Sequence, residues 1–187
     1  MSLLALDARW RRFNDEARTC PCCGRRFSGI YDLGFDHPSD WSHDARGDAP
    51  FVKEGEDQLS PDLCRHGDNR YLRAVLSMPV QGAEESILIT PWVQVSPEIF
   101  YGYLETWDDP SAPLPPSAEA ILANDLPGLA AAGSLMTAAF PNRDARPILS
   151  FRDSTLNQPM TQGISFDRLL DLYAAFGDDI RPHLLRD

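Results

Sequence analysis

Two neighbouring strand patterns place the strongest constraint on the fold. Over residues 70–78, apolar side chains alternate with a more polar set, which is the period of a half-buried strand. Pro79 ends this stretch, and the turn-like residues 81–83 lead to a second strand candidate over 86–95. Strands joined by so short a connection are expected to pair antiparallel. Pro91 lies within the second candidate and predicts an edge position, a bulge or a break there.

Helical patterns occur near the start, in the middle and near the end of the chain. Residues 5–18 place three large apolar side chains on one face, surrounded by charged residues. Ser96 is a suitable cap for a predicted helix over 97–107, which begins with proline and carries an aromatic stripe. Ser165 caps a last predicted helix over 166–176, which a glycine follows.

Three further strand candidates extend the predicted sheet. They cover residues 119–123, 134–140 and 147–151, and turn-rich segments separate them. With the first two strands they make about five, a common sheet size. The predicted fold class is therefore α+β, with a mainly antiparallel sheet of about five strands, flanking helices and an N-terminal cysteine knuckle.

The length of 187 residues fits a single domain over residues 1–187. Within it, residues 19–69 are expected to form the cysteine knuckle and a long irregular loop rich in Gly, Asp, Pro and His. Residues 70–187 are expected to form the α+β core. Long irregular loops in compact domains are usually functional, mobile or held by a ligand.

The charge of the chain excludes several classes of partner. The formal net charge is −11, with 28 acidic and 17 basic residues, and Lys53 is the only lysine. Binding to nucleic acid or to an anionic membrane needs clustered basic residues, so neither partner is expected. The N-terminus lacks the pattern of a signal peptide, and no apolar run approaches the roughly 20 residues of a spanning helix. These features predict a cytoplasmic protein.

Three of the four cysteines lie within the six residues Thr19–Gly24. In a reducing compartment such cysteines are typically metal-bound, redox-active or free. Cys20 and Cys23 have the C-x-x-C spacing, followed by Gly24, that supplies two zinc ligands from one tight turn. Cys22 is expected outside the site because adjacent side chains diverge.

The predicted zinc site needs ligands from elsewhere in the chain. Cys64 is the natural third ligand, and the fourth position is open among the histidines of the irregular segment. His66 lies two residues from Cys64 and is favoured slightly over His37 and His43. The predicted metal ligands are therefore Cys20, Cys23, Cys64 and His66, with Zn²⁺ as the cofactor.

Two other interpretations of the cysteines stay open. In the first, the cysteines are free thiols that bind no metal and have no redox role. A thioredoxin-type redox pair would have a buried strand before the motif and an apolar helix after it, whereas polar and charged residues flank Cys20 and Cys23 on both sides. Metal binding is favoured first, free thiols second and redox chemistry third. No phosphate-binding loop, nucleophile elbow or H-E-x-x-H motif is present, so no catalytic residue is predicted.

Six short stretches occur in a distinctive order and spacing. They are Cys20–Gly24, Asp62–Cys64, Arg73–Gly82, Trp92–Ser96, Arg146–Pro147 and Gln162–Ile164. In this pattern the chain resembles an uncharacterised bacterial family, domain of unknown function 2199, and the resemblance spans nearly the whole chain from residue 19.

The resemblance implies no established activity. Family members often carry a histidine four residues after the second cysteine of the motif, where this chain has Phe27. The fourth metal position is then left to His66, His43, Cys22 or water.

These features predict a cytoplasmic bacterial protein that binds a partner and is not an enzyme. It is expected to have a structural zinc site and a sheet surface that binds an unidentified protein or small molecule. The alternative is a metal- or thiol-dependent enzyme in which Cys20, Cys23 and Cys64 leave one coordination position open for water or substrate.

Overall fold

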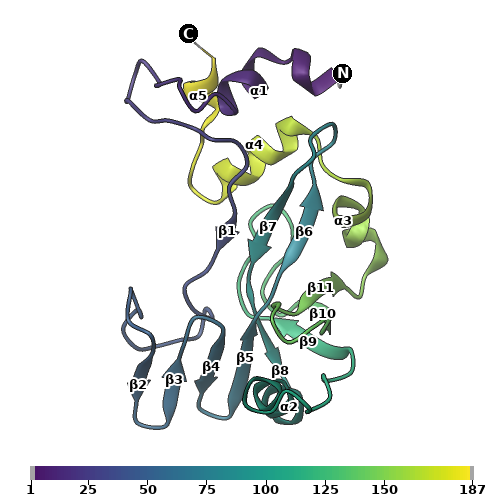
Figure 1. Cartoon of the computed structure of the whole chain (residues 1–187). Helices are drawn as coiled ribbons and strands as arrows, with labels where there is room; N and C mark the ends of the chain where they lie inside the picture. The colour runs from purple at the N-terminus through teal and green to yellow at the C-terminus, as the bar shows by residue number, and fades with distance from the viewer. Residues whose placement is uncertain (1–2, 186–187) are drawn as a thin grey trace. The chain divides into compact units, whose positions relative to one another are not determined.

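The computed structural model describes residues 3–185 and has an α+β fold with mostly antiparallel strands (Figure 1). Its contacts divide these residues into two compact units. Unit 1 contains residues 3–33, 77–88 and 158–185, and unit 2 contains residues 34–76 and 89–157. Both units combine segments that are distant in the sequence, so their limits do not follow the predicted boundary between residues 69 and 70. The single domain over 1–187 stays a prediction.

Unit 2 is built on an eight-stranded sheet with the strand order β11-β10-β9-β8-β5-β4-β3-β2. Each strand pairs antiparallel with its neighbours. The strands are β2 (Val52–Glu54), β3 (Asp57–Leu59), β4 (Leu63–His66), β5 (Asn69–Arg73), β8 (Trp92–Val95), β9 (Ala118–Leu122), β10 (Leu135–Ala139) and β11 (Ile148–Phe151).

The prediction of about five strands is therefore wrong for this sheet. The additional strands β2, β3 and β4 lie in the segment expected to be an irregular loop. They have three or four residues each and carry many polar side chains, so they show little hydrophobic period. Ladder hydrogen bonds and tight turns form them instead. The turns begin at Gly55 and Gly67, whose positive φ angles of 62° and 54° suit two-residue hairpins.

The two strand patterns of the central hairpin each divide into two strands. β5 is followed by β6 (Leu76–Pro79), and β7 (Ser86–Thr90) is followed by β8. β6 and β7 belong to a three-stranded sheet of order β1-β7-β6, in which β1 is Leu33–Gly34. Pro91 separates β7 from β8, as its position predicted, and its carbonyl accepts the Ala74 N–H at 2.9 Å. The antiparallel pairing is confirmed by β5 and β8, where Leu72 lies opposite Val93.

The helices α2 (Pro97–Asp108) and α4 (Phe166–Ala175) are confirmed, with Ser96 and Ser165 as their caps. The first predicted helix is shorter than expected. Asp7 accepts the Arg9 N–H and begins α1 (Ala8–Phe13), so the residues before it form a separate 3-10 turn, η1 (Leu3–Leu6). The remaining helices are η2 (Ser154–Asn157), α3 (Gln158–Gln162) and α5 (Arg181–Leu184).

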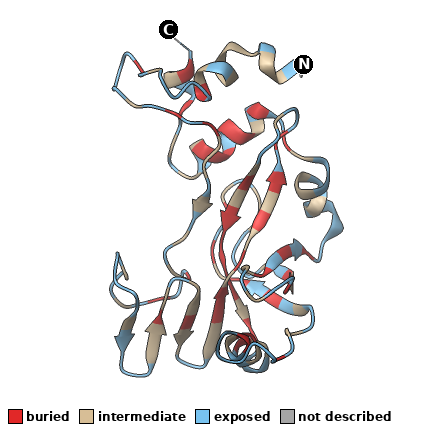
Figure 2. Ribbon diagram, viewed as in Figure 1, coloured by how far each residue is buried: buried red, intermediate tan, exposed pale blue. Residues whose placement is uncertain are grey.

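Each unit has buried residues of its own, drawn in red in Figure 2, and many of them are aromatic. In unit 1 the fully buried Phe13 is surrounded by aromatic rings at centroid distances of 5.8–6.4 Å. These rings belong to Trp10, Phe27, Tyr31, Phe166 and Tyr173. In unit 2 a buried cluster contains Trp41, Leu59, Cys64, Tyr71 and Trp92.

None of the helices between residues 3 and 185 combines the length and apolarity needed to cross a membrane.

Candidate functional site

The cysteine knuckle of unit 1 is a tight loop closed by backbone hydrogen bonds. Thr19 and Arg26 form an antiparallel bridge, and inside it the Cys20 N–H donates to the Arg25 carbonyl at 2.8 Å. The Gly24 N–H donates a hydrogen bond to the Cys20 carbonyl at 2.9 Å. Gly24 has a φ of +76°, which favours a residue without Cβ. The turn directs the cysteine side chains toward one point.

A histidine from α5 completes a cluster of four side chains in unit 1. The Nδ1 atom of His183 lies 3.5 Å from the Sγ of Cys20, 3.3 Å from that of Cys22 and 3.4 Å from that of Cys23. The Sγ atoms of Cys20 and Cys22 are 3.1 Å apart. Within residues 3–185, these four side chains are close enough together to hold a metal ion.

The spacing of this cluster can be compared with a tetrahedral zinc site. Ligand bonds of about 2.3 Å to sulfur and about 2.0–2.1 Å to nitrogen give tetrahedral edges of about 3.6 Å between S and N and about 3.8 Å between two S atoms. The three S–N distances approach that edge, while the Cys20–Cys22 distance is shorter. To bind a zinc ion, the cluster would need only a small increase in the distance between the Cys20 and Cys22 sulfurs.

The thiols of the cluster have unequal proton affinities. A hydrogen bond from Cys22 lowers the pKa of Cys20 to about 6, and the same contact raises the pKa of Cys22 to about 11. The contact therefore favours ionisation of Cys20 over ionisation of Cys22. It is also the buried member of the cluster, whereas Cys22 and Cys23 are exposed.

An ion pair holds the loop after the cysteines against the C-terminal segment of unit 1. Arg25 donates two hydrogen bonds to the carboxylate of Asp178, at 2.6 and 2.7 Å, and the Tyr31 hydroxyl donates a third at 2.7 Å. The guanidinium of Arg25 holds the pKa of Asp178 below its usual value. These contacts position the knuckle beside α5.

Cys64, the predicted third ligand, is a core residue of unit 2. It lies on β4, fully buried among Trp41, Leu59 and Tyr71, and burial raises the pKa of its thiol to about 12. Among the described residues it belongs to neither of the two clusters that could hold a metal. Its place in the zinc site stays a prediction, but a thiol in this environment is poorly suited to act as a nucleophile.

His66, the predicted fourth ligand, also belongs to unit 2 and lies in the second cluster, with His43 and Asp57. The structure therefore brings Cys20 and Cys23 together in one unit and places Cys64 and His66 in the other. His37 is in neither cluster, and its Nδ1 lies 2.8 Å from the Pro38 carbonyl oxygen.

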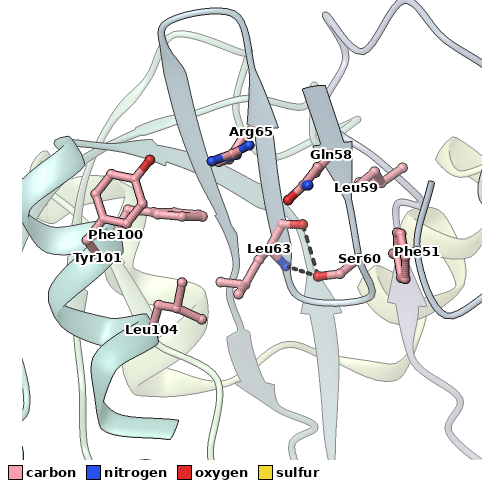
Figure 3. Close-up of a pocket in the computed structure, with 9 residues that line it drawn as sticks. All are labelled: Phe51, Gln58, Leu59, Ser60, Leu63, Arg65, Phe100, Tyr101 and Leu104. Atoms are coloured by element: carbon pink, nitrogen blue, oxygen red, sulfur yellow. Dashed lines mark hydrogen bonds between the residues drawn. The ribbon is translucent and has the colours of Figure 1, made fainter. Parts of the chain in front are cut away.

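Unit 2 also contains a pocket of about 350 Å³ between α2 and strands β3 and β4 (Figure 3). Apolar side chains make up most of the wall, and Arg65 and Gln58 supply polar groups. The Phe51 and Tyr101 rings on its border are exposed. The lining residues are Phe51, Gln58, Leu59, Ser60, Leu63, Arg65, Phe100, Tyr101 and Leu104.

Arg65 is the charged group of this pocket. Its Nη2 donates to the Glu56 carbonyl at 3.0 Å, but its Nε is buried and has no hydrogen-bond partner among residues 3–185. The Arg70 guanidinium, which donates to the Tyr101 hydroxyl at 3.1 Å, and Arg65 itself lower the pKa of Tyr101. The pocket is thus apolar with a local positive charge.

Comparison with known proteins identifies one family. The family described as uncharacterized proteins conserved in bacteria, DUF2199, matches residues 19–164. The chain belongs to this family. No curated protein and no solved structure matches it.

The DUF2199 match includes the cysteine knuckle but ends before His183. The family resemblance implies that members often carry a histidine at the position of Phe27. In the structure the Phe27 ring packs beside the His183 imidazole, with 6.2 Å between ring centroids, so a histidine from α5 lies next to this position.

The ligand set predicted from the sequence lacks two members of the cluster. Cys22 is kept there only as one alternative for the fourth position, because neighbouring side chains diverge, yet the turn brings its Sγ within 3.3 Å of the His183 Nδ1. His183 is separated from Cys20 by 163 positions. The one sequence feature that could have indicated it as a ligand is its residue type, a histidine in the short helix α5. Neither spacing nor periodicity connects residues so far apart.

Proposed function

We propose that this DUF2199 protein binds one structural zinc ion through Cys20, Cys22, Cys23 and His183. The observation that carries the proposal is the convergence of three Sγ atoms on one Nδ1 atom, at 3.3–3.5 Å. Three thiolates and one imidazole are a common ligand set for structural zinc. Reduced cysteines of this kind fit a reducing compartment, in agreement with the cytoplasmic location expected from the sequence.

A structural role follows from the number of ligands. Four protein donors fill a tetrahedral site, whereas a catalytic zinc keeps one position for water or substrate. The ion would join the knuckle to α5, which are far apart in the sequence, and would stabilise unit 1 by closing that long loop. The alternative of an enzyme using Cys20, Cys23 and Cys64 is less favoured, because Cys64 is a buried thiol with a raised pKa.

Two cysteine substitutions test this ligand set. Cys22→Ser is expected to lower the zinc content by about one ion per chain, because it removes a thiolate that the ion needs. Cys64→Ala is the matched control and is expected to keep the wild-type content. Zinc is measured by elemental mass spectrometry after gel filtration, with circular dichroism to check folding. Loss of zinc in Cys64→Ala alone would support the ligand set predicted from the sequence and contradict the present one.

The pocket of unit 2 favours a second candidate function. We infer that it binds a small apolar molecule with one anionic group. Its volume of about 350 Å³ falls within the range of ligand pockets, and its wall is mostly apolar. The buried Nε of Arg65 has no partner among the described residues and would donate to an anionic oxygen. The concave shape favours a small molecule over a protein as the bound partner.

The fluorescent probe anilinonaphthalene sulfonate, which is apolar and anionic, tests this pocket. Arg65→Met is expected to weaken the binding of the probe about tenfold. Loss of a charged hydrogen bond costs about 1.5–3 kcal/mol, and the apolar contacts that methionine keeps with the probe hold the loss near the lower end of this range. Arg152→Met, an arginine exposed elsewhere on unit 2, is the control and is expected to bind like wild type. Equal binding by all three proteins would place the probe outside this pocket.

A further inference from the structure

A second group of metal-binding side chains lies in unit 2, where the strand register brings two of them together. Gln58 pairs with Arg65 and Leu59 pairs with Cys64 across β3 and β4. Because side chains alternate between faces along a strand, Asp57 and His66 lie on the same sheet face as Leu59 and Cys64. The pocket residues Gln58 and Arg65 lie on the opposite face. His43, from the segment between β1 and β2, joins Asp57 and His66.

The ligand atoms of these three residues are close together. The His43 Nε2 lies 2.8 Å from the Asp57 Oδ2, and the His66 Nε2 lies 3.8 Å from the same oxygen. All three side chains are half-buried, with 20–29% of each exposed. An ion at this point would be accessible from solvent and still bound by protein groups.

Outer hydrogen bonds hold the group in position. The Gly67 N–H donates to the Asp57 Oδ1 at 2.7 Å, which leaves the Oδ2 for the two histidines. The Nδ1 of His66 faces the Asp40 carboxylate at 3.6 Å, and the Tyr71 hydroxyl donates to that carboxylate. A carboxylate behind a metal-binding histidine is the usual arrangement in metal sites, because it fixes the ring and raises its basicity.

The aromatic core supports the same two rings from behind. Trp41 contacts the His43 ring edge to face, with 4.8 Å between centroids, and lies 5.7 Å from the His66 ring. Trp41 is itself buried in the unit 2 cluster, so the histidines rest on a rigid base. Positions fixed in this way reduce the entropy lost when an ion binds.

We propose that His43, Asp57 and His66 form a second metal site, which binds a divalent transition-metal ion such as Fe²⁺ or Zn²⁺. Two imidazoles and one carboxylate are typical ligands for these ions, and three protein ligands leave coordination positions for water or substrate. The ion replaces the proton that His43 shares with Asp57. It also balances the negative charge of the nearby Asp40 carboxylate. The His66 Nε2 also lies 3.2 Å from the Ser42 Oγ, a contact that a bound ion would replace.

Cobalt(II) is the probe that distinguishes this site from the thiolate cluster. The full-length protein is first loaded with one equivalent of Zn²⁺, which the softer thiolate site takes preferentially. Added Co²⁺ is then expected to bind as one further equivalent, measured by calorimetry. The absorption spectrum of this bound Co²⁺ is expected to lack a thiolate-to-cobalt charge-transfer band. The band is expected only when Co²⁺ is added without zinc.

His66→Ala and Asp57→Asn are expected to weaken this second binding step at least about 100-fold, since removing a ligand costs more than the 10- to 100-fold typical of an outer-shell change. His37→Ala, which removes a histidine of unit 2 outside the cluster, is expected to leave it unchanged. Asp57→Asn keeps the shape of the side chain and provides the result if His66→Ala fails to fold. The proposal is overturned if Asp57→Asn binds Co²⁺ like wild type, or if the zinc-loaded wild type binds no further Co²⁺ although the zinc-free protein shows the thiolate-to-cobalt band. Absence of that band without zinc would instead contradict the thiolate cluster, so the two failures are distinguishable.

Discussion

Replacing His183 with alanine is expected to remove most of the thermal stability that zinc gives to the protein. A ligand that binds only the folded state stabilises it by about 4 kcal/mol when its free concentration is about 1,000 times the Kd. For a chain of this length, that corresponds to a rise of about 10 °C in Tm. Wild-type protein should therefore melt about 10 °C higher with zinc than after chelation, and in His183→Ala most of this difference should be lost.

The same experiment has a matched control in His37→Ala. His37 is a histidine outside both clusters, so its variant is expected to keep the zinc-dependent shift. Differential scanning calorimetry with zinc and with a chelator measures both variants. A His183→Ala protein that keeps the wild-type shift would show that the histidine of α5 is not a ligand.

Trp92→Ala is expected to lower the free energy of unfolding by about 3–5 kcal/mol, the range for a fully buried aromatic residue. Trp92 is inaccessible to solvent on β8, and its Nε1–H donates to the Phe35 carbonyl at 3.0 Å. Its ring packs in the cluster that also contains Trp41 and Cys64. The substitution leaves a cavity at the centre of unit 2 and removes the hydrogen bond to the Phe35 carbonyl.

Trp107→Ala is the control for this change. Trp107 lies at the end of α2 with 44% of its surface exposed, so its loss is expected to cost less than about 1 kcal/mol. Urea unfolding at 25 °C, with zinc present in every sample, measures both variants. Similar losses for the two tryptophans would contradict the core assigned to unit 2.

The elements with strong local signals were predicted correctly from the sequence. α2 and α4 have a serine cap, an apolar stripe and a clear end, and each is found within one residue of its predicted limits. The break at Pro91 follows from the lost N–H of proline. Strands β2, β3 and β4 were missed because their residues are polar and their stability comes from pairing with neighbours.

The candidate zinc site was predicted only where its ligands have a recognised metal-binding spacing. The C-x-x-C spacing identified Cys20 and Cys23, which the structure places in one cluster. The remaining two members depend on the conformation of the folded chain. A bend of the backbone brings in Cys22, and the packing of α5 brings in His183, whereas Cys64 and His66 were chosen for their residue type and lie in the other unit.

X-ray absorption at the zinc edge of the Cys64→Ala protein, loaded with one zinc ion per chain, tests the central claim most directly. This variant keeps only Cys20, Cys22 and Cys23, so a third sulfur ligand can come only from Cys22. The account predicts three sulfur atoms at about 2.3 Å and one nitrogen at about 2.0–2.1 Å. A shell with two sulfur atoms, or a protein that no longer binds zinc, would contradict it.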